Sequence, residues 1–265
     1  MGLMTGTGPL SRTPAGRFNF EPPPGGALYL EPTPKRIRVV VAGEAVADSR
    51  AAMIMSETGH QPVYYFPPGD VRMDLLEPSD RRTRCPKKGE ASYHSIRVGE
   101  RLVESGAWHY PEPLEGAPPF GGMIAFYWSR MDQWFEEDEE VFGHPRNPYH
   151  RVDCVPTSRR LRVEVARTVV VDTTATTGVY ETALAPRLYV DRSAVRGARL
   201  APSSSTSYCP YKGTATWWDL ELGDTVVHDA AWSYDDPLPE SLSIRGLLAF
   251  DEARVGVTAD LPPST

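Results

Sequence analysis

The chain of 265 residues carries 28 Lys and Arg against 35 Asp and Glu, a formal net charge of −7 that argues against a nucleic-acid partner, whose binding surface is normally basic. Hydrophobic residues make up 40% of it, but no apolar run of 18 or more residues is present, so no membrane span is expected. Three cysteines are an odd number and do not make a disulfide framework, which favours the reducing cytoplasm.

The first half of the chain begins with a leader and continues into short predicted strands. Residues 1–35 are rich in glycine, proline and threonine, lack the apolar core of a signal peptide, and are predicted to be a flexible leader. Alternating or β-branched apolar runs, stopped by proline or glycine, then predict strands, with residues 71–76 as a strand or a short turn. The predicted strands are residues 36–41, 44–48, 51–57, 63–66, 91–98, 101–104, 108–110 and 123–128. Short strands of this kind predict a mainly β domain over residues 36–130.

The segment that follows this domain has a different pattern. Met131, Trp134, Phe135 and Phe142 recur at helical spacing, and residues 136–140 (EEDEE) cover the other face. The pattern predicts a short acidic helix and a connector over residues 131–159. A solvated helix face is the ordinary role of such a charge run, and a metal or a cationic partner is the alternative.

The chain then repeats itself at a constant offset of 124 residues. Residues 85–89 (CPKKG) return as 209–213 (CPYKG), and residues 107–110 (AWHY) return as 231–234 (AWSY). A period this long is a whole domain, because solenoid units have 20–50 residues. We therefore predict a second copy of the same domain over residues 160–256, followed by a flexible tail at 257–265.

Several motifs together resemble the domain of unknown function 427 family. They are the Cys-Pro-x-Lys-Gly turn, the Trp-x-Tyr-x-x-Pro run, and residues 64–67 (YYFP), 70–76 (DVRMDLL) and 134–149. The last of these is similar to the connector of bacterial two-copy members. The resemblance implies a small, mostly β fold of the β-tent kind with a short helix. It implies no settled reaction: the family has carried a nucleotidyltransferase-like label, but the sequence has no phosphate-binding glycine-rich loop and no paired metal carboxylates.

The Cys-Pro-x-Lys-Gly turn supplies two candidate catalytic residues, Cys85 and Lys88. Proline fixes φ after the cysteine and glycine permits a tight bend after the lysine, so the turn could hold an ammonium group near a sulfur. A nearby positive charge favours the nucleophilic thiolate. The structural alternative is that the cysteine is simply buried, and that the proline and glycine only shape the turn.

Glu57 is the third candidate catalytic residue. It lies late in an apolar run and recurs as Glu181, and a carboxylate on a half-buried strand needs a partner. Burial would make it a general acid or base, and the alternative is a structural ion pair with Arg72 or Arg196. Aromatic residues are candidates for pocket walls or for the core. The predicted substrate-binding residues are Tyr65, Arg72, Trp108 and Tyr110, and the second-copy equivalents of all candidates are Glu181, Tyr189, Arg196, Cys209, Lys212, Trp232 and Tyr234.

Three histidines occur only in the first copy. His60, His94 and His109 align with residues 184, 218 and 233, none of which is histidine. They could act as acid–base groups or metal ligands with Glu57, or could be ordinary polar side chains. Because no His-x-x-x-His or Cys-x-x-Cys spacing is present, we expect no metal and no cofactor.

These observations predict an enzyme without a cofactor, a hydrolase, isomerase or cyclase that acts on a small organic molecule near the Cys-Pro-x-Lys-Gly turn. In this hypothesis Lys88 or Arg72 holds an anion, and Glu57 or Cys85 moves a proton or attacks. One alternative is a small-molecule binding module without turnover, and another is an interaction protein that uses its acidic helix. The sequence leaves open which copy is active, whether both contribute to one site, and whether the chain forms a homo-oligomer.

Overall fold

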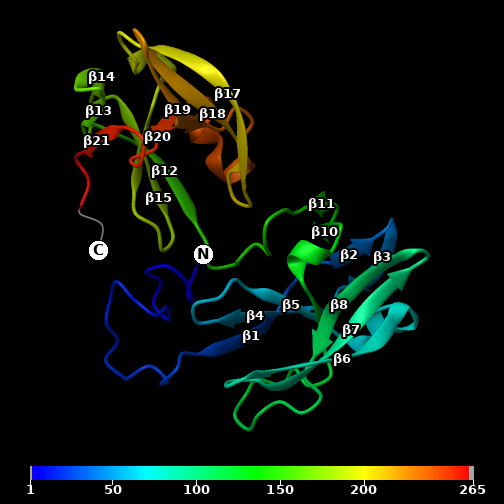
Figure 1. Cartoon of the computed structure of the whole chain (residues 1–265). Helices are drawn as coiled ribbons and strands as arrows, with labels where there is room; N and C mark the ends of the chain where they lie inside the picture. Colours follow the sequence, from blue (N-terminus) through cyan, green and yellow to red (C-terminus); the bar gives the residue numbers. More distant parts are fainter. Residues whose placement is uncertain (1, 263–265) are drawn as a thin grey trace. The chain divides into compact units, whose positions relative to one another are not determined.

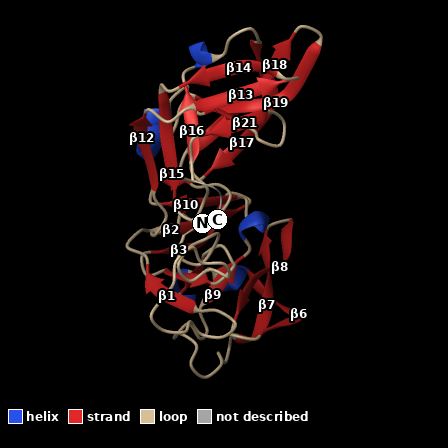
Figure 2. Ribbon diagram, turned by 90° about the vertical axis from the view of Figure 1, so that its left-hand side faces the viewer, coloured by secondary structure: helices blue, strands red, loops and turns tan. Residues whose placement is uncertain are grey.

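The chain divides into two compact units, Met1–Pro148 and Tyr149–Thr265, and the computed structural model describes residues 2–262. Strands are the main secondary structure of each unit, and the helices of the described part are short 3₁₀ turns (Figure 1, Figure 2). None of these helices is long and apolar enough to cross a membrane. The prediction of a mainly β fold with two repeated domains is confirmed.

The first unit combines a seven-stranded and a four-stranded antiparallel sheet. The larger sheet has the order β1-β4-β5-β9-β8-β7-β6 and the smaller has the order β11-β10-β2-β3. The strands are β1 Leu28–Pro32, β2 Ile37–Val41, β3 Glu44–Ser49, β4 Met53–Glu57, β5 Val63–Phe66, β6 Leu76–Cys85, β7 Gly89–Val98, β8 Arg101–His109, β9 Ile124–Phe126, β10 Gln133–Glu136 and β11 Glu139–Glu140. The 3₁₀ turns are η1 Pro68–Asp70, η2 Met73–Leu75 and η3 Trp128–Arg130.

The larger sheet of the first unit has a hydrophobic core on each face. Successive residues of a strand point to opposite faces, so Tyr64 and Tyr65 of β5 enter different cores. Tyr64 packs with apolar residues of β2 and β3, such as Val39, in the core between the two sheets. Tyr65 packs with Tyr93 and Phe120 on the other face. This second face carries the candidate site.

The second unit repeats this plan. Its larger sheet has the order β12-β15-β16-β20-β19-β18-β17, and its smaller sheet has the order β14-β13-β21. The strands are β12 Val152–Thr157, β13 Leu161–Val165, β14 Thr168–Thr173, β15 Thr176–Glu181, β16 Arg187–Val190, β17 Arg199–Cys209, β18 Gly213–Leu222, β19 Thr225–Ser233, β20 Leu248–Phe250 and β21 Gly256–Ala259. The 3₁₀ turns are η4 Arg192–Ala194 and η5 Pro239–Ile244.

Rare backbone conformations recur at the offset of 124 residues. Ala42 has a φ of 49° and Ala166 a φ of 47°, while Ser105 has a φ of 46° and Asp229 a φ of 51°. Positive φ is uncommon for residues other than glycine, so two matched pairs are strong evidence of a shared backbone. The two units are therefore structural duplicates as well as sequence repeats.

The predicted acidic helix at residues 131–142 is wrong, because this segment forms the β10–β11 hairpin. Strand β10 pairs with β2 from Gln133, opposite Val40, to Glu136, opposite Ile37. Glu137 has a φ of 54° and makes the turn. A strand, a turn and a second strand also bring apolar residues back at intervals of three to seven, which explains the misleading helical spacing. An interaction protein built on an acidic helix therefore has no structural basis.

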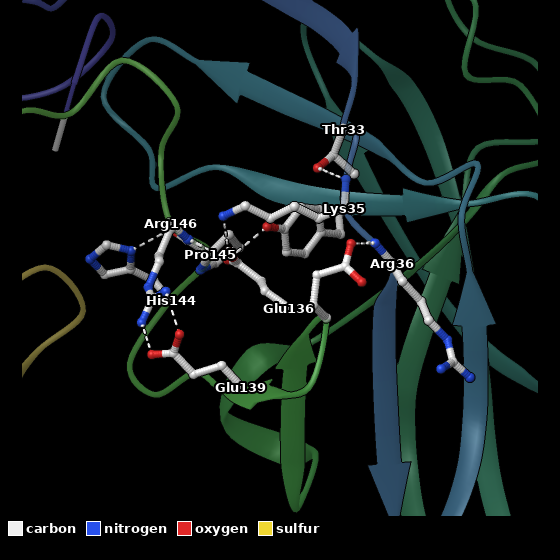
Figure 3. Close-up of polar contacts among 10 residues, drawn as sticks. Thr33, Lys35, Arg36, Glu136, Glu139, His144, Pro145 and Arg146 are labelled. Atoms are coloured by element: carbon white, nitrogen blue, oxygen red, sulfur yellow. Dashed lines mark hydrogen bonds and ion pairs between the residues drawn. The ribbon is translucent and has the colours of Figure 1, made fainter. Parts of the chain in front are cut away.

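One glutamate of this hairpin is buried and holds the chain segment that follows it. Glu136 is only 4% exposed, and its carboxylate accepts hydrogen bonds from Lys35 Nζ at 2.5 Å, Tyr64 Oη at 2.9 Å and the Arg146 amide at 3.0 Å. Figure 3 shows Glu136 beside Lys35 and Arg146, and the neighbouring pair between the Arg146 guanidinium and Glu139. The acidic run thus contains one buried glutamate, Glu136, as well as solvent-exposed acidic side chains.

The two terminal segments are more ordered than predicted. Residues 28–32 of the predicted leader form β1, and Met4, at 2% exposure, accepts a hydrogen bond from the Gly59 amide through its carbonyl oxygen at 2.7 Å. Residues 256–259, which include the start of the predicted tail, form β21 and pair with β13. The rest of that prediction reaches residues 263–265, outside the described residues. The predicted connector 131–159 is divided between the two units.

Candidate ligand-binding clefts

The Cys-Pro-x-Lys-Gly turn closes the hairpin between β6 and β7. Cys85 pairs with Gly89 across the ladder, and the Lys88 carbonyl oxygen accepts a hydrogen bond from the Leu114 amide at 3.2 Å. Gly89 has a φ of 106°, and a Cβ there would lie 3.1 Å from the Glu112 carbonyl oxygen. Only glycine meets both conditions without strain. The motif therefore fixes the backbone from which the Lys88 side chain extends.

The Lys88 side chain reaches β4 and pairs with Glu57. Lys88 Nζ lies 2.5 Å from Glu57 Oε2, and Lys87 Nζ lies 3.0 Å from Oε1. The side chains of Glu57 and Lys88 are 10% and 12% exposed. Burial by itself would raise the pKa of the Glu57 carboxyl, but the hydrogen bonds and charges of Lys88 and Lys87 outweigh it and lower that pKa. Glu57 is therefore an ionised carboxylate near neutral pH.

The second unit repeats the pair with a different second partner. Lys212 is bonded to Glu181, and His150 Nε2 lies 3.0 Å from Glu181 Oε1. The His150 ring stacks on Tyr211, with 3.7 Å between ring centroids, and Tyr211 occupies the sequence position of Lys87. Burial again opposes ionisation of Glu181, but the hydrogen bonds and charges of His150 and Lys212 outweigh it and lower its pKa.

The Lys88–Glu57 pair lies on the wall of an open cleft of about 750 Å³ in the first unit. Aromatic rings form another wall: the Trp108 and Tyr127 centroids are 4.6 Å apart, and Lys88 Nζ lies 5.8 Å from the Tyr110 ring centroid. Burial raises the pKa values of the buried Tyr65 and the cleft residue Tyr110, so both keep neutral hydroxyl groups. A cleft of this size, with mixed aromatic and charged walls, suits a small organic molecule.

The second unit has a smaller cleft of about 350 Å³ at the corresponding place. Its lining includes five of the predicted second-copy residues, Glu181, Tyr189, Lys212, Trp232 and Tyr234. Trp232 Nε1 donates a hydrogen bond to Tyr189 Oη at 3.1 Å. Both units thus have a lysine–glutamate pair and aromatic residues in a cleft, and the volumes of the two clefts differ about twofold.

Comparison with protein families identifies both units. A family described as a domain of unknown function (DUF427) matches residues 29–137 and again residues 153–261. The chain belongs to this family. The two matches are offset by the same 124 residues as the internal repeat and together cover most of the sequence, which confirms the predicted two-copy organisation. No curated protein matches the chain.

Most of the predicted site residues of the first DUF427 copy meet in one place. Cys85, Lys88, Glu57, Trp108 and Tyr110 all line the cleft. Tyr65, at 1% exposure, belongs to the core beside it.

In the Cys-Pro-x-Lys-Gly turn the ammonium group of the lysine is bonded to a carboxylate. Lys88 Nζ is bonded to Glu57, and residues 2–262 contain no hydrogen bond between Lys88 and Cys85. The corresponding Cys209 packs against the core of the second copy as a partly buried residue.

The prediction that Arg72 belongs to this site is wrong. Arg72 lies just before η2, and its guanidinium donates to Asp74 from Nε at 2.8 Å and from Nη2 at 2.7 Å. Its amide donates to the Val46 carbonyl oxygen, which places it beside the smaller sheet and away from Glu57. Arg196, the equivalent residue in the second copy, is also exposed and does not line the second cleft.

The three histidines of the first copy are divided between two places. His60 lines the cleft, with Nε2 3.9 Å from Glu57 Oε1. His94 Nε2 and His109 Nδ1 lie 3.2 Å apart on β7 and β8, and burial is the main cause that lowers both pKa values. Within residues 2–262 no group of three or more His, Cys, Asp or Glu side chains is arranged to hold a metal ion.

Sequence reasoning missed three residues that line these clefts or contact their glutamates. Lys87 stands inside the recognised motif, but it differs between the copies and so gave no repeated signal. Arg84 precedes the motif in a strand that was not predicted. His150 lies 31 residues before Glu181 and has no histidine counterpart in the first copy, so only the fold brings it to the carboxylate.

Proposed function

We propose that the first DUF427 copy is an enzyme that moves a proton within a small organic molecule held in its cleft. One observation carries the proposal: a largely buried carboxylate, Glu57, stands at the wall of an open cleft with its charge held by Lys88 and Lys87. A base and a cation side by side are the two groups needed to remove a proton next to a carbonyl and to stabilise the resulting oxyanion.

In this reaction the substrate carbonyl oxygen accepts a hydrogen bond from Lys88. The ammonium group is then shared, so its hold on Glu57 weakens and the pKa of Glu57 rises toward that of a useful base. The neighbouring C–H bond breaks, its proton passes to Glu57, and its electron pair moves to the carbonyl oxygen to give an enolate. Return of the proton to a different atom completes an isomerisation. Attack of the enolate carbon on a second carbonyl carbon of the same molecule breaks that C=O π bond, and the resulting alkoxide takes the proton from Glu57 to complete a cyclisation.

Hydrolysis through a cysteine nucleophile has less support. A nucleophilic thiol needs a cation or a base that favours the thiolate. Lys88 is bonded to Glu57, and the described residues place no hydrogen bond between Lys88 and Cys85. We therefore assign Cys85 to the cleft wall. We also propose that the protein works in the cytoplasm, because its three cysteines are free thiols.

A binding module without turnover is the second candidate. The observation in its favour is the lowered pKa of Glu57 in the resting cleft, which makes the carboxylate a weak base unless a ligand draws Lys88 away.

Deuterium exchange separates the two candidates. The full chain is incubated in D₂O with a panel of small ketones and aromatic or aliphatic oxo acids, and deuterium incorporation at carbon is followed by NMR. We expect exchange of at least one panel member above the buffer rate, and a loss of about 10²-fold or more in Glu57→Gln. The matched Glu181→Gln variant retains the wild-type rate. Exchange that survives in Glu57→Gln, or a panel that binds without exchanging, contradicts the enzyme.

A further inference from the structure

The two copies differ most in the charges of one strand and the turn that follows it. Arg81, Arg82 and Arg84 of β6 and Lys87 of the turn correspond to Ser, Thr, Tyr and Tyr at positions 205, 206, 208 and 211. Both copies thus keep the Lys–Glu pair, but the first copy alone has these four cations, of which Arg84 and Lys87 line the cleft with the pair. Packing of the fold does not need these cations, because the second copy folds the same way without them.

The cationic side chains give the first cleft an excess of positive charge. Its lining includes Arg12, Arg84, Lys87 and Lys88 but a single carboxylate, Glu57. In the second cleft the lining cations are two, Arg187 and Lys212. The first of these also lies 3.5 Å from the carboxylate of Glu252, and the second is bonded to Glu181. The first cleft therefore attracts an anion, and the second is close to neutral.

Arg84 and Lys87 are the two lining cations that we consider available to a ligand. Lys87 and Lys88 share one carboxylate, which neutralises only one of them. Arg84 is exposed and forms no ion pair with any residue in the range 2–262. Arg84 and Lys87 lie three residues apart, at the end of β6 and in the turn, and both line the cleft. A planar carboxylate is the anion that a guanidinium and an ammonium group bind well together.

The aromatic wall beside these cations is built differently in the two copies. In the second cleft Trp232 packs against Trp217, with 5.3 Å between ring centroids. In the first copy the Tyr127 and Trp108 ring centroids lie 4.6 Å apart, and the Arg130 guanidinium lies 4.6 Å from the Tyr127 ring centroid. The second copy has Asp251 at the position of Tyr127. A flat ring gains most from packing against a rigid wall of this kind.

We propose that the cleft of the first copy binds an aryl carboxylate and that the cleft of the second copy does not. The aromatic ring lies against Trp108 and Tyr127, and the carboxylate lies at Arg84 and Lys87. This arrangement leaves Lys88 and Glu57 free for a carbonyl group elsewhere on the same molecule. The inference rests on the proposed function in using the same cleft, and it adds the substrate class: an aromatic acid that also carries a carbonyl group.

Calorimetric titration of the full chain with 2-naphthoate and with 2-naphthamide tests this inference, because the probes share a ring system and differ in charge. We expect one naphthoate per chain, at least tenfold weaker binding of the amide, and an affinity for naphthoate that falls as salt rises. The double variant Arg84→Gln/Lys87→Gln should bind naphthoate at least tenfold more weakly, since both charged contacts are lost. The matched Arg187→Gln variant, altered in the second cleft, should bind as the wild type does.

Three results would overturn the aryl carboxylate: equal binding of the two probes, two naphthoates per chain, or unchanged binding in a double variant whose circular dichroism matches the wild type. Failure of the enzyme proposal looks different. If naphthoate binds as expected but no panel member exchanges deuterium, the aryl carboxylate proposal is supported and the enzyme proposal is contradicted. If deuterium exchange depends on Glu57 but naphthoate does not bind, the enzyme proposal is supported and the aryl carboxylate proposal is contradicted.

Discussion

The two copies hold the same glutamate–lysine pair in two different ways. In the first copy the second oxygen of Glu57 faces Lys87, a cation that lines a cleft of about 750 Å³. In the second copy the equivalent oxygen faces His150, whose side chain is 1% exposed and stacks on Tyr211 beside a cleft of about 350 Å³. The first arrangement leaves charge available to a ligand, and the second encloses it within the protein. We infer that duplication preserved the pair while the surroundings diverged toward binding in one copy and packing in the other.

The largest expected effect is a loss of stability when the lysine of a glutamate–lysine pair is replaced, and it should differ between the two copies. Lys212→Met leaves the largely buried Glu181 with only His150, and we expect it to destabilise the second copy by about 2–3 kcal/mol, below the usual range for breaking a buried pair because one partner remains. Lys88→Met leaves Glu57 with the ammonium of Lys87, so we expect a loss of about 1 kcal/mol in the first copy. Hydrogen exchange of the full chain, followed by mass spectrometry at β15 and β4, measures each loss locally.

The double variant Lys87→Met/Lys88→Met sharpens this comparison. With both ammonium groups gone, the loss at β4 should rise to that of Lys212→Met. Equal losses in the two single variants would show instead that Lys87 supports Glu57 no better than His150 supports Glu181, and the contrast between the copies would then rest on the clefts alone.

The repeat made the fold and part of the site predictable. Alternating apolar residues in β2 and β13 signal strands because one face of each is buried and the other is not. Glu57 and Lys88 were identified because both recur at the same offset, which substituted for a comparison between proteins. Their direct contact across 31 residues was not predicted, because the sequence alone led us to pair the glutamate with an arginine.

Other features of the structure could not be predicted from the sequence pattern. Strand β6 is ten residues long but mostly exposed, and the equivalent β17 is rich in serine, so neither shows alternating apolar residues. The β10–β11 hairpin looked helical because its buried Glu136 is charged and was read as part of a solvated face. Arg72 was placed in the site from its repeated position, although its partner Asp74 lies two residues away in the sequence. A repeated residue can therefore mark shared packing as readily as shared chemistry.

The next effect tests a contact that the first copy has and the second lacks. Glu136→Gln removes the charge that binds Lys35, Tyr64 and the Arg146 amide (Figure 3), and we expect a loss of about 1–2 kcal/mol because charge-assisted hydrogen bonds become neutral ones. The matched Asp260→Asn change alters an exposed residue at the equivalent position and should stay within about 0.5 kcal/mol. Hydrogen exchange at β10 and β21 gives the two values. A loss at β21 as large as that at β10 would contradict a special role for Glu136.

The smallest effect concerns pH. Both glutamates have folded-state pKa values below their unfolded values, so the stability from each pair is fully present above about pH 4.5 and is lost as pH falls through the folded pKa. Hydrogen exchange at pH 6 and pH 3, corrected for the intrinsic exchange rate, measures that loss at β4 and β15. Glu57→Gln should reduce the acid-induced loss at β4 by about 1 kcal/mol and leave the loss at β15 unchanged, while Glu181→Gln should do the reverse. A change in both copies from either variant would mean that the two carboxylates titrate as one coupled system, and the independence of the two clefts would have to be abandoned.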